Sequence, residues 1–403
     1  METTCCIAGG GPAGMMAGFL LARMGVDVIV LEKHADFLRD FRGDTIHPST
    51  LEIMAELGLL EEFLKRPHDE VRELAGQIGA ETVTIVDFTH LRTRCKFMAL
   101  MPQWDFLDFL AGHAARLPSF RVMMRAEAIG LVERDGRVAG ITARTEDGEQ
   151  EILADLVLAC DGRHSLLRGA AGLEVEDLGA PMDVFWMRLS RHPTDPAQTF
   201  GHFEPGRIFI MLNRNDYWQC AYVIAKGSAD AVRARGLAEF RAAIVALSPY
   251  LADRVDELHS WDDIKLLSVA VDRLKRWHRP GLLCIGDAAH AMSPIGGIGI
   301  NLAIQDAVAT ANILGPELRA GTLSDEHLAQ LQRRREWPTR MTQGLQVFVQ
   351  SRMIGRVLAS TKPMATPFVA KLLQHFPLLR RIPARVVGMG FRPEHVREGG
   401  AAF

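Results

Sequence analysis

The sequence lacks the features that mark membrane-spanning and nucleic-acid-binding proteins. No apolar run approaches the roughly 20 residues needed to span a bilayer, and no charged segment with a cleavage site precedes the first apolar run. The net charge of −3 over 403 residues leaves no basic excess for nucleic acid. We therefore expect a soluble, cytoplasmic protein without a transmembrane segment and without a nucleic-acid partner.

The sequence also lacks the residue patterns of metal sites and of nucleophilic active sites. The six cysteines show no paired metal-ligand spacing, and four of them lie in apolar runs that predict strands, which suits buried free thiols in a reducing compartment. The sequence contains no Ser-His-Asp set, no metal or phosphate-transfer motif, and no internal repeat. These absences argue against nucleophilic hydrolysis, metal catalysis and phosphoryl transfer, and we expect no bound metal.

The chain does contain a glycine-rich turn near its start. Residues 5–8 predict a short strand that leads into Gly9-Gly10-Gly11-Pro12-Ala13-Gly14, and a helical segment follows to Met24. Residues 26–31 predict a second strand, which ends at Glu32. A strand, a glycine turn, a helix and an acidic residue at this spacing are typical of the dinucleotide-binding fingerprint.

Each part of this fingerprint has a physical role. Gly9 permits the tight turn, Gly11 lets a pyrophosphate approach the backbone, and Gly14 lets the helix meet the strand. Glu32 is placed to bind ribose hydroxyls. Because Lys33 follows Glu32, the pair favours the adenosine half of FAD, although the fingerprint alone would equally allow NAD. The cofactor contacts predicted here are Gly9, Gly11, Pro12, Ala13, Gly14, Glu32 and Lys33.

A second glycine-rich loop lies later in the chain. Residues 282–285 predict a buried strand, and residues 301–314 predict a helix. Glycine lets the backbone of the loop approach a ligand, and a helix start offers unpaired N–H groups and a positive dipole end. This helix start is therefore a suitable seat for a negatively charged reduced flavin, and Asp287 can accept hydrogen bonds from a sugar or ribityl hydroxyl.

This loop also carries a family resemblance. It contains, in order, Gly286-Asp287-Ala288-Ala289-His290, Pro294, Gly296, Gly299 and Asn301. The run resembles the second flavin fingerprint of the single-component FAD-dependent aromatic hydroxylases, typified by p-hydroxybenzoate hydroxylase. Ser293-Pro294 stands where the family commonly has Pro-Pro, and Ile298 stands where it often has a polar residue. With the other motifs, the resemblance covers most of residues 4–315.

The resemblance implies roles for further residues. The additional cofactor contacts that it implies are Arg42, Gln103, Asp161, Asp287, Gly299, Ile300 and Asn301. The residues expected to shape the reaction space beside the flavin ring are Pro294, Gly296 and Gly297. The expected substrate contacts are Tyr217, Gln219 and Tyr222.

The substrate contacts come from a strand in which alternate residues face opposite ways. Trp218, Cys220 and Tyr222 share one face of it, and Gln219 and Ala221 share the other. The sequence leaves open which of the two faces looks at the flavin.

The resemblance further implies an α/β fold: a Rossmann-like FAD-binding domain with an inserted β-sheet substrate domain and a C-terminal helical segment. We expect the FAD-binding domain over residues 1–175 and 276–330, the substrate domain over residues 176–275, and the helical segment over residues 331–403. Within the first domain, Asp135-Gly136 and Asp147-Gly148 predict the turns of a three-stranded meander.

The implied activity is that of an oxidoreductase. In the resembled family, NADPH or NADH reduces the bound FAD, O₂ adds at the flavin C4a, and the resulting hydroperoxide hydroxylates an aromatic or polycyclic small molecule. Two alternatives stay open. One is a non-hydroxylating flavin reductase or dehydrogenase of the same fold, and the other is a non-enzymatic, flavin-binding interaction protein.

The C-terminal segment is basic and apolar at once. Residues 341–403 carry nine Lys or Arg and two Asp or Glu, so their balance is 9 − 2 = +7. This composition predicts either a weak contact with an anionic membrane surface or a partner, or a helical cover over the substrate domain. A homodimer is a further expectation.

Overall fold

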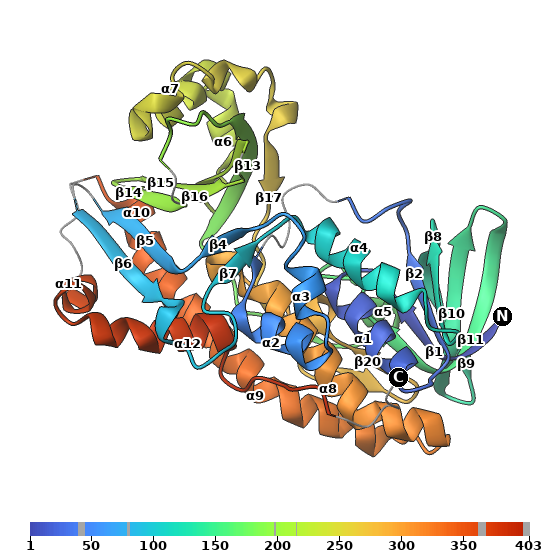
Figure 1. Cartoon of the computed structure of the whole chain (residues 1–403). Coiled ribbons are helices and arrows are strands. Elements are labelled where there is room, and N and C mark those ends of the chain that lie inside the picture. Colours follow the sequence, from blue (N-terminus) through green and yellow to red (C-terminus); the bar gives the residue numbers. More distant parts are fainter. Residues whose placement is uncertain (39–44, 79–80, 197–198, 215, 362–367, 398–403) are drawn as a thin grey trace.

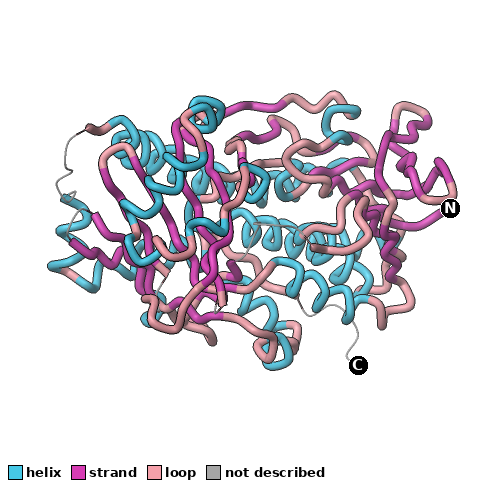
Figure 2. Tube along the Cα trace, turned by 90° about the horizontal axis from the view of Figure 1, so that it is seen from above, coloured by secondary structure: helices cyan, strands magenta, loops and turns pink. Residues whose placement is uncertain are grey.

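The computed structural model of the chain (Figure 1) describes residues 1–38, 45–78, 81–196, 199–214, 216–361 and 368–397. Its two large sheets, of eight and seven strands, have helices packed around and between them. Seen from above, strands gather toward the two ends of the molecule and helices run between them (Figure 2). The α/β class and the helical C-terminal segment expected from the sequence are confirmed.

The first sheet has the order β19-β20-β11-β1-β2-β8. Five of its strands are parallel: β1 (Glu2–Ala8), β2 (Val28–Glu32), β8 (Phe120–Met124), β11 (Gly148–Ala159) and β20 (Leu282–Cys284). β19 (His278–Arg279) is antiparallel at the edge. Parallel strands are covered on both faces, and this explains why residues 5–8 and 28–31 are apolar without alternation and fully buried.

Helices and a meander complete this half. α1 (Pro12–Arg23) packs against α8 (Ile298–Ala320) and α4 (Gln103–Ala114). β9 (Glu127–Arg134) and β10 (Arg137–Thr145) join β11 in the predicted antiparallel meander. Asp135 and Gly136 have φ angles of 50° and 73°, the left-handed values that a two-residue hairpin turn needs.

The second sheet has the order β17-β13-β16-β15-β14-β5-β6. Its strands are β5 (Glu73–Ile78), β6 (Glu81–Asp87), β13 (Met182–Ser190), β14 (Phe200–Glu204), β15 (Arg207–Asn213), β16 (Tyr217–Ala225) and β17 (Lys265–Leu267). β5 and β6 lie outside the range 176–275 predicted for the substrate domain, yet β5 pairs in parallel with β14. The sequence did not predict this pairing, because a pairing between distant segments leaves no local pattern in either strand.

The two faces of the second sheet have different neighbours. The outer face includes Trp218 and Tyr222, and it packs against α6 (Ala229–Ala234) and α7 (Leu237–Leu247). The inner face includes Ala221 and Val223, and it packs with Ile295 of the second glycine-rich loop. Of the two faces that strand alternation distinguishes, the face of Ala221 is therefore the one that looks toward that loop.

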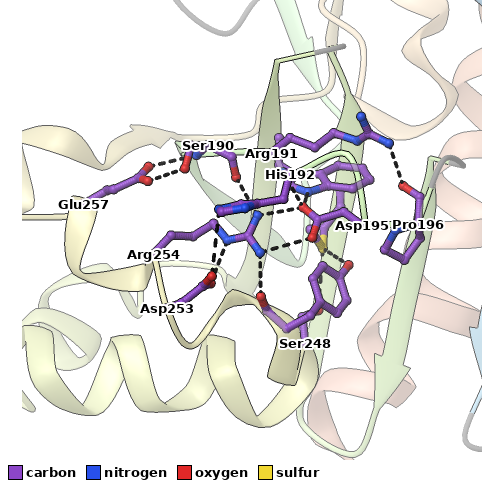
Figure 3. Close-up of polar contacts among 12 residues, drawn as sticks. Ser190, Arg191, His192, Asp195, Pro196, Ser248, Asp253, Arg254 and Glu257 are labelled. Carbon is purple, nitrogen blue, oxygen red and sulfur yellow. Dashed lines mark hydrogen bonds and ion pairs between the residues drawn. The ribbon is translucent and has the colours of Figure 1, made fainter.

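A buried ion pair holds the outer elements of this sheet together (Figure 3). Arg254 donates to both carboxylate oxygens of Asp195, at 2.7 and 3.1 Å, and Trp218 Nε1 donates to the same carboxylate at 2.9 Å. Burial raises the pKa of Asp195, but Arg254 and Trp218 outweigh it, and the pKa is lowered. This network stabilises the outer layer and lies on the face turned away from Ile295.

The C-terminal helices cover one edge of the second sheet. α9 (Asp325–Val349) leads into a π-helical segment, η7 (Gln350–Ile354), and then into α10 (Gly355–Ala359), α11 (Phe368–His375) and α12 (Arg381–Met389). Ala384 and Val387 of α12 pack with Val86 and Phe88 at the end of β6, below β5 and β6 in Figure 1. In the part of the chain that is described, no helix has the length and apolar character that would let it cross a membrane.

Short elements complete the described fold. The remaining strands form the β12–β18 ribbon and the sheet β3-β7-β4, and α2, α3 and α5 are short helices. The bounds are β3 (Thr45–Ile46), β4 (Asp69–Val71), β7 (Met98–Leu100), β12 (Val175–Asp177), β18 (Asp272–Leu274), α2 (Pro48–Glu56), α3 (Leu60–Phe63) and α5 (Leu166–Ala170).

Candidate functional site

The predicted cofactor residues follow the ends of parallel strands. Gly9 follows β1, Glu32 ends β2, Asp161 follows β11 and Gly286 follows β20. Because these strands run in parallel as neighbours, their carboxyl ends meet at one edge of the first sheet. The structure therefore brings four segments that are far apart in sequence to one edge.

The three fingerprint glycines differ in what surrounds them. A Cβ atom on Gly9 (φ 106°) would lie 2.4 Å from the carbonyl oxygen of Cys160, and one on Gly14 would lie 2.0 Å from that of Gly9. A Cβ on Gly11 would meet no atom of the described residues within 4 Å. Protein packing thus demands Gly9 and Gly14, whereas Gly11 leaves the open space that a pyrophosphate needs beside the α1 start. Pro12 and Ala13 open that helix.

Glu32 is held in place by backbone groups. Its carboxylate accepts hydrogen bonds from the N–H of Gly10 at 3.2 Å and the N–H of His34 at 3.0 Å, and it is buried. Lys33 is exposed. The acidic side chain therefore has a fixed position beside the glycine turn, as the assignment to ribose hydroxyls requires.

Asp161 has an unused acceptor. Its Oδ2 accepts from Leu167 N at 3.1 Å at the start of α5, while its buried Oδ1 has no hydrogen-bond partner within the described ranges. A buried carboxylate oxygen without a donor is costly, and a cofactor hydroxyl at this strand edge would satisfy it. Neighbouring Arg168 is structural instead, because it pairs with Asp272 at 3.2 Å.

Asp287 belongs to an ion pair that the sequence reasoning missed. Arg163 NH2 lies 3.6 Å from Asp287 Oδ2, and both side chains are partly exposed. The only sequence signal for Arg163 is its place two residues after the predicted cofactor contact Asp161. The pair joins the residues after β11 to those after β20.

The loop before α8 has a backbone that only glycine adopts readily. Gly296 and Gly297 have φ angles of 74° and 62°, and a Cβ on Gly297 would lie 2.2 Å from Thr45 Oγ1. α8 starts at Ile298, so its first N–H groups, including those of Gly299 and Ile300, lack partners inside the helix. The loop is therefore followed directly by the positive end of a helix.

Asn301 has a different role from the predicted one. Its Nδ2 donates to the carbonyls of Thr45 at 3.1 Å and Gly297 at 3.2 Å, and its Oδ1 accepts from His47 N at 2.9 Å and Thr50 Oγ1 at 2.7 Å. These four bonds use every hydrogen-bonding position of the amide. The side chain thus holds the start of α8 to the start of α2, and it has no position left for a cofactor.

His47 is fully buried beside this junction. Its Nδ1 lies 2.7 Å from the carbonyl oxygen of Val387 in α12, so the ring donates there. Burial lowers the pKa of His47 to about 4, although the carbonyls of Val387 and Gly296 act in the opposite direction. The ring is therefore neutral at physiological pH.

We expect His47 to make the fold sensitive to mild acid. Its folded-state pKa of about 4 lies below its ordinary value of 6.5, so the stabilisation is complete above pH 6.5 and is lost as the pH falls toward 4. The full loss is on the order of 3 kcal/mol, at about 1.4 kcal/mol per pKa unit. Between pH 7.5 and pH 5, the free energy of unfolding measured with urea should fall less for His47→Gln than for the wild type. The same change at exposed His259 should leave the pH dependence as it is.

A buried charge network contacts the residues that open the second glycine-rich loop, Gly286 and His290. Asp306 of α8 accepts from Gly286 N at 3.1 Å, lies 2.6 Å from His290 Nε2, and pairs with Arg335 of α9 at 2.9 Å. Arg335 also reaches Glu394, at 3.3 Å. Burial raises the pKa of Asp306, but His290 and Arg335 outweigh it, so the pKa is lowered. No motif pointed to Asp306, Arg335 or Glu394.

The predicted substrate residues do not share one face. Tyr222 lies on the outer face, 5.1 Å from Phe240 between ring centroids, so it is turned away from Ile295. Gln219 lies on the inner face and accepts from Arg214 Nε at 3.0 Å. Tyr217 lies two residues before Gln219 on the same strand face. We therefore withdraw Tyr222 as a substrate contact, because strand alternation places it behind the sheet.

Two other predicted cofactor residues stay predictions. Gln103 is the first residue of α4 and is partly buried. Arg42 lies outside the described residues.

The described pockets lie elsewhere. One of about 540 Å³ is lined by α8, α9 and the C-terminal segment, and one of about 300 Å³ lies behind the second sheet near Tyr222 and Phe240. Neither is lined by a residue of the two glycine-rich loops, so the strand edge and the α8 start remain the candidate site.

Known proteins are similar to this chain in sequence and in fold. Residues 2–344 match the family described as FAD binding domain. A 6-methylpretetramide 4-monooxygenase of Streptomyces rimosus is 32% identical over 406 residues, which is 100% of this chain and 97% of that protein. A rifampicin monooxygenase of Streptomyces venezuelae is 30% identical over 312 residues, which is 75% of this chain and 61% of that protein.

Among solved structures, PqsL of P. aeruginosa in complex with 2-aminobenzoylacetate superposes with a TM-score of 0.76 at 20% identity, covering 89% of this chain and 98% of that one. This likeness supports the fold. The motif resemblance is thereby confirmed, and the chain belongs to the family of FAD-dependent aromatic monooxygenases, which are oxidoreductases that bind FAD.

Proposed function

We propose that the protein uses NAD(P)H and O₂ to hydroxylate a neutral aromatic or polycyclic small molecule. The observation that carries this proposal is the contact between the second glycine-rich loop and the inner face of the second sheet. Ile295, three residues before α8 starts, packs against the apolar cluster that includes the inner-face residues Ala221 and Val223. A flavin ring at the α8 start would thus face an apolar surface that suits an aromatic substrate.

The chain's own groups would hold the cofactor and exclude water. The open space at Gly11 would take the pyrophosphate, the free Oδ1 of Asp161 and the Asp287 carboxylate would accept from hydroxyls, and the N–H groups at the α8 start would stabilise negative charge on the reduced ring. FAD, when bound, supplies the redox chemistry: it takes a hydride from NAD(P)H and delivers one oxygen atom of O₂, while the other leaves as water. With one dinucleotide fingerprint in the sequence, the nicotinamide must visit and leave.

We also propose a division of labour within the chain. Residues 1–175 and 276–330, without β5 and β6, would form the FAD-binding part. Residues 176–275, with β5 and β6, would form the substrate sheet, and residues 331–403 its helical cover. The pairing of β5 with β14 and the packing of α12 on β6 support this division.

The test measures the three reactants together. Holoenzyme with a panel of phenols and hydroxylated polycycles should consume NAD(P)H and O₂ in equal amounts and yield one hydroxylated product for each. Mixing anaerobically reduced protein with O₂ should also give a transient absorbance that belongs to neither reduced nor oxidised flavin. Hydride consumption that continues without O₂ would instead establish the reductase alternative, and a protein that turns over neither would be the flavin-binding interaction protein.

The exposed end of the C-terminal helices supports a weak membrane contact, which we propose as a secondary property of a cytoplasmic protein. The exposed apolar side chains are Phe376, Leu378 and Ile382, and the exposed basic ones beside them are Lys371, Arg381 and Arg385. This combination suits an anionic membrane surface. The protein should sediment with phosphatidylserine-containing vesicles but not with pure phosphatidylcholine. Self-association without vesicles, measured by ultracentrifugation, would assign the surface to a homodimer instead.

A further inference from the structure

Three glutamines line one face of α9 and of the π-helical turn after it. Gln343, Gln346 and Gln350 follow one another at spacings of three and four residues, which places them on the same side of a helix. Gln343 Nε2 donates to the carbonyls of Asp272 at 2.7 Å and Ala291 at 3.1 Å. This face of α9 is therefore hydrogen-bonded to the backbone that leads into the second glycine-rich loop.

Gln346 forms hydrogen bonds with the loop itself. Its Oε1 accepts from Ser293 N at 3.1 Å, and its Nε2 donates to the carbonyls of Ser293 at 3.1 Å and Ile295 at 3.2 Å. The residues on both sides of Pro294 are thus fixed to α9 by a single amide.

Gln350 continues the series, but its side chain has no hydrogen bond to a described residue. It is 1% exposed, and neither its Nε2 nor its Oε1 has a hydrogen-bond partner among the residues that the structure describes. A buried amide with both ends unsatisfied is rare in folded proteins and calls for a ligand or an ordered water. The α-helix also widens into η7 at this residue, and such π-helical turns occur frequently at functional sites.

The neighbours of Gln350 place it beside the proposed reaction space. One turn before it, Gln346 bonds to Ile295; one turn after it, Ile354 packs in the same apolar cluster as Ile295 and the inner face of the second sheet. Gln350 therefore lies where the loop, the helix and the inner face meet. Trp186 on that face likewise has a buried Nε1 without an acceptor in the described part of the chain.

We propose that Gln350 is a specificity-determining residue that hydrogen-bonds the substrate, and that the substrate carries a donor and an acceptor side by side on a neutral polycycle. An amide offers one acceptor and two donors, so its best complement is a carboxamide or a keto–enol edge. The buried members of the apolar cluster beside it are Met182, Val184, Ile208, Ala221, Val223, Val269, Ile354 and Val357. The proposal rests on the proposed function for the position of the substrate, but not for the occurrence of turnover.

The test is a binding titration, which needs no turnover. Oxidised holoenzyme is titrated with 3-hydroxy-2-naphthamide and with 2-naphthol, which lacks the amide, and the flavin absorbance reports occupancy. The wild type should bind the naphthamide at least about tenfold more tightly, a difference of about 1.4 kcal/mol. Gln350→Leu should remove this preference and leave the 2-naphthol affinity unchanged. Equal affinities in the wild type, or a preference that survives in Gln350→Leu, would overturn the proposal.

Thermal unfolding keeps the proposal testable without any ligand. Because Gln350→Leu removes two unsatisfied polar atoms from the interior, the variant should melt at a temperature equal to or higher than that of the wild type. A lower melting temperature would show that the amide has structural partners and would contradict the proposal. The control is Gln330→Leu at an exposed position of α9, which should change neither binding nor melting. Selective naphthamide binding by a protein that consumes no O₂ with any member of the panel would leave this inference intact and refute the proposed oxygenation instead.

Discussion

Replacing Arg335 with alanine should destabilise the protein by about 3–5 kcal/mol, the usual loss when one partner of a buried ion pair is removed. Arg335 is 1% exposed and contacts Asp306 at 2.9 Å and Glu394 at 3.3 Å. Without the guanidinium, the carboxylate of the fully buried Asp306 keeps, among the described residues, only His290 and the N–H of Gly286 as partners. Chemical denaturation followed by circular dichroism measures the loss.

A matched control lies on the same helix. Arg340 is 55% exposed and pairs with Glu336 one turn away, at 2.7 Å. Exposed pairs of this kind contribute less than about 1 kcal/mol, so Arg340→Ala should unfold nearly as the wild type does. Equal losses at the two positions would mean that the buried network contributes nothing particular to the fold.

The network also has an acid dependence of known sign. The pKa of Asp306 is lowered in the folded protein, so its stabilisation is complete above the ordinary carboxyl value of 3.8 and is lost as the pH falls below it. The stability of the wild type should therefore decline below about pH 4, and that of Asp306→Asn less steeply.

The sequence predicts well whatever depends on neighbours along the chain. Gly9, Gly14 and Gly297 could be recognised because a turn or a close approach requires glycine itself, and each proves to lack room for a Cβ atom. The strands that lead into the two glycine-rich loops are predicted by short apolar runs between turn residues. The meander turn at Asp135-Gly136 is equally local.

What the sequence could not predict depends on contacts between distant segments. β5 joins β14 across more than a hundred residues, and Arg335 meets Asp306 across 29. The motif singles out Asn301 as a cofactor contact, but the contacts of its side chain follow only from the positions of Thr45 and His47, which no spacing reveals. Strand alternation separated Gln219 from Tyr222 without saying which faced the loop, because that depends on the helices packed behind the sheet.

Replacing Gly11 with valine should give a folded but colourless protein. Gly11 has φ −76° and ψ −176°, an extended backbone that any residue adopts, and its Cβ would meet no described atom within 4 Å. The fold should therefore accept the side chain, whereas a pyrophosphate at the start of α1 could no longer approach the backbone. We expect FAD retention to fall by at least about 100-fold, or about 2.7 kcal/mol.

Two further glycines separate loss of the cofactor from loss of the fold. Gly14→Val places a Cβ 2.0 Å from the carbonyl oxygen of Gly9, so it should lose both structure and flavin. Gly112→Val in α4 meets open space away from the strand edge and should lose neither. The ratio of flavin to protein absorbance and the melting temperature, measured on all three variants, distinguish these outcomes. A Gly11→Val protein that stays yellow and fully loaded would mean that the pyrophosphate lies elsewhere, and the whole strand-edge assignment would have to move with it.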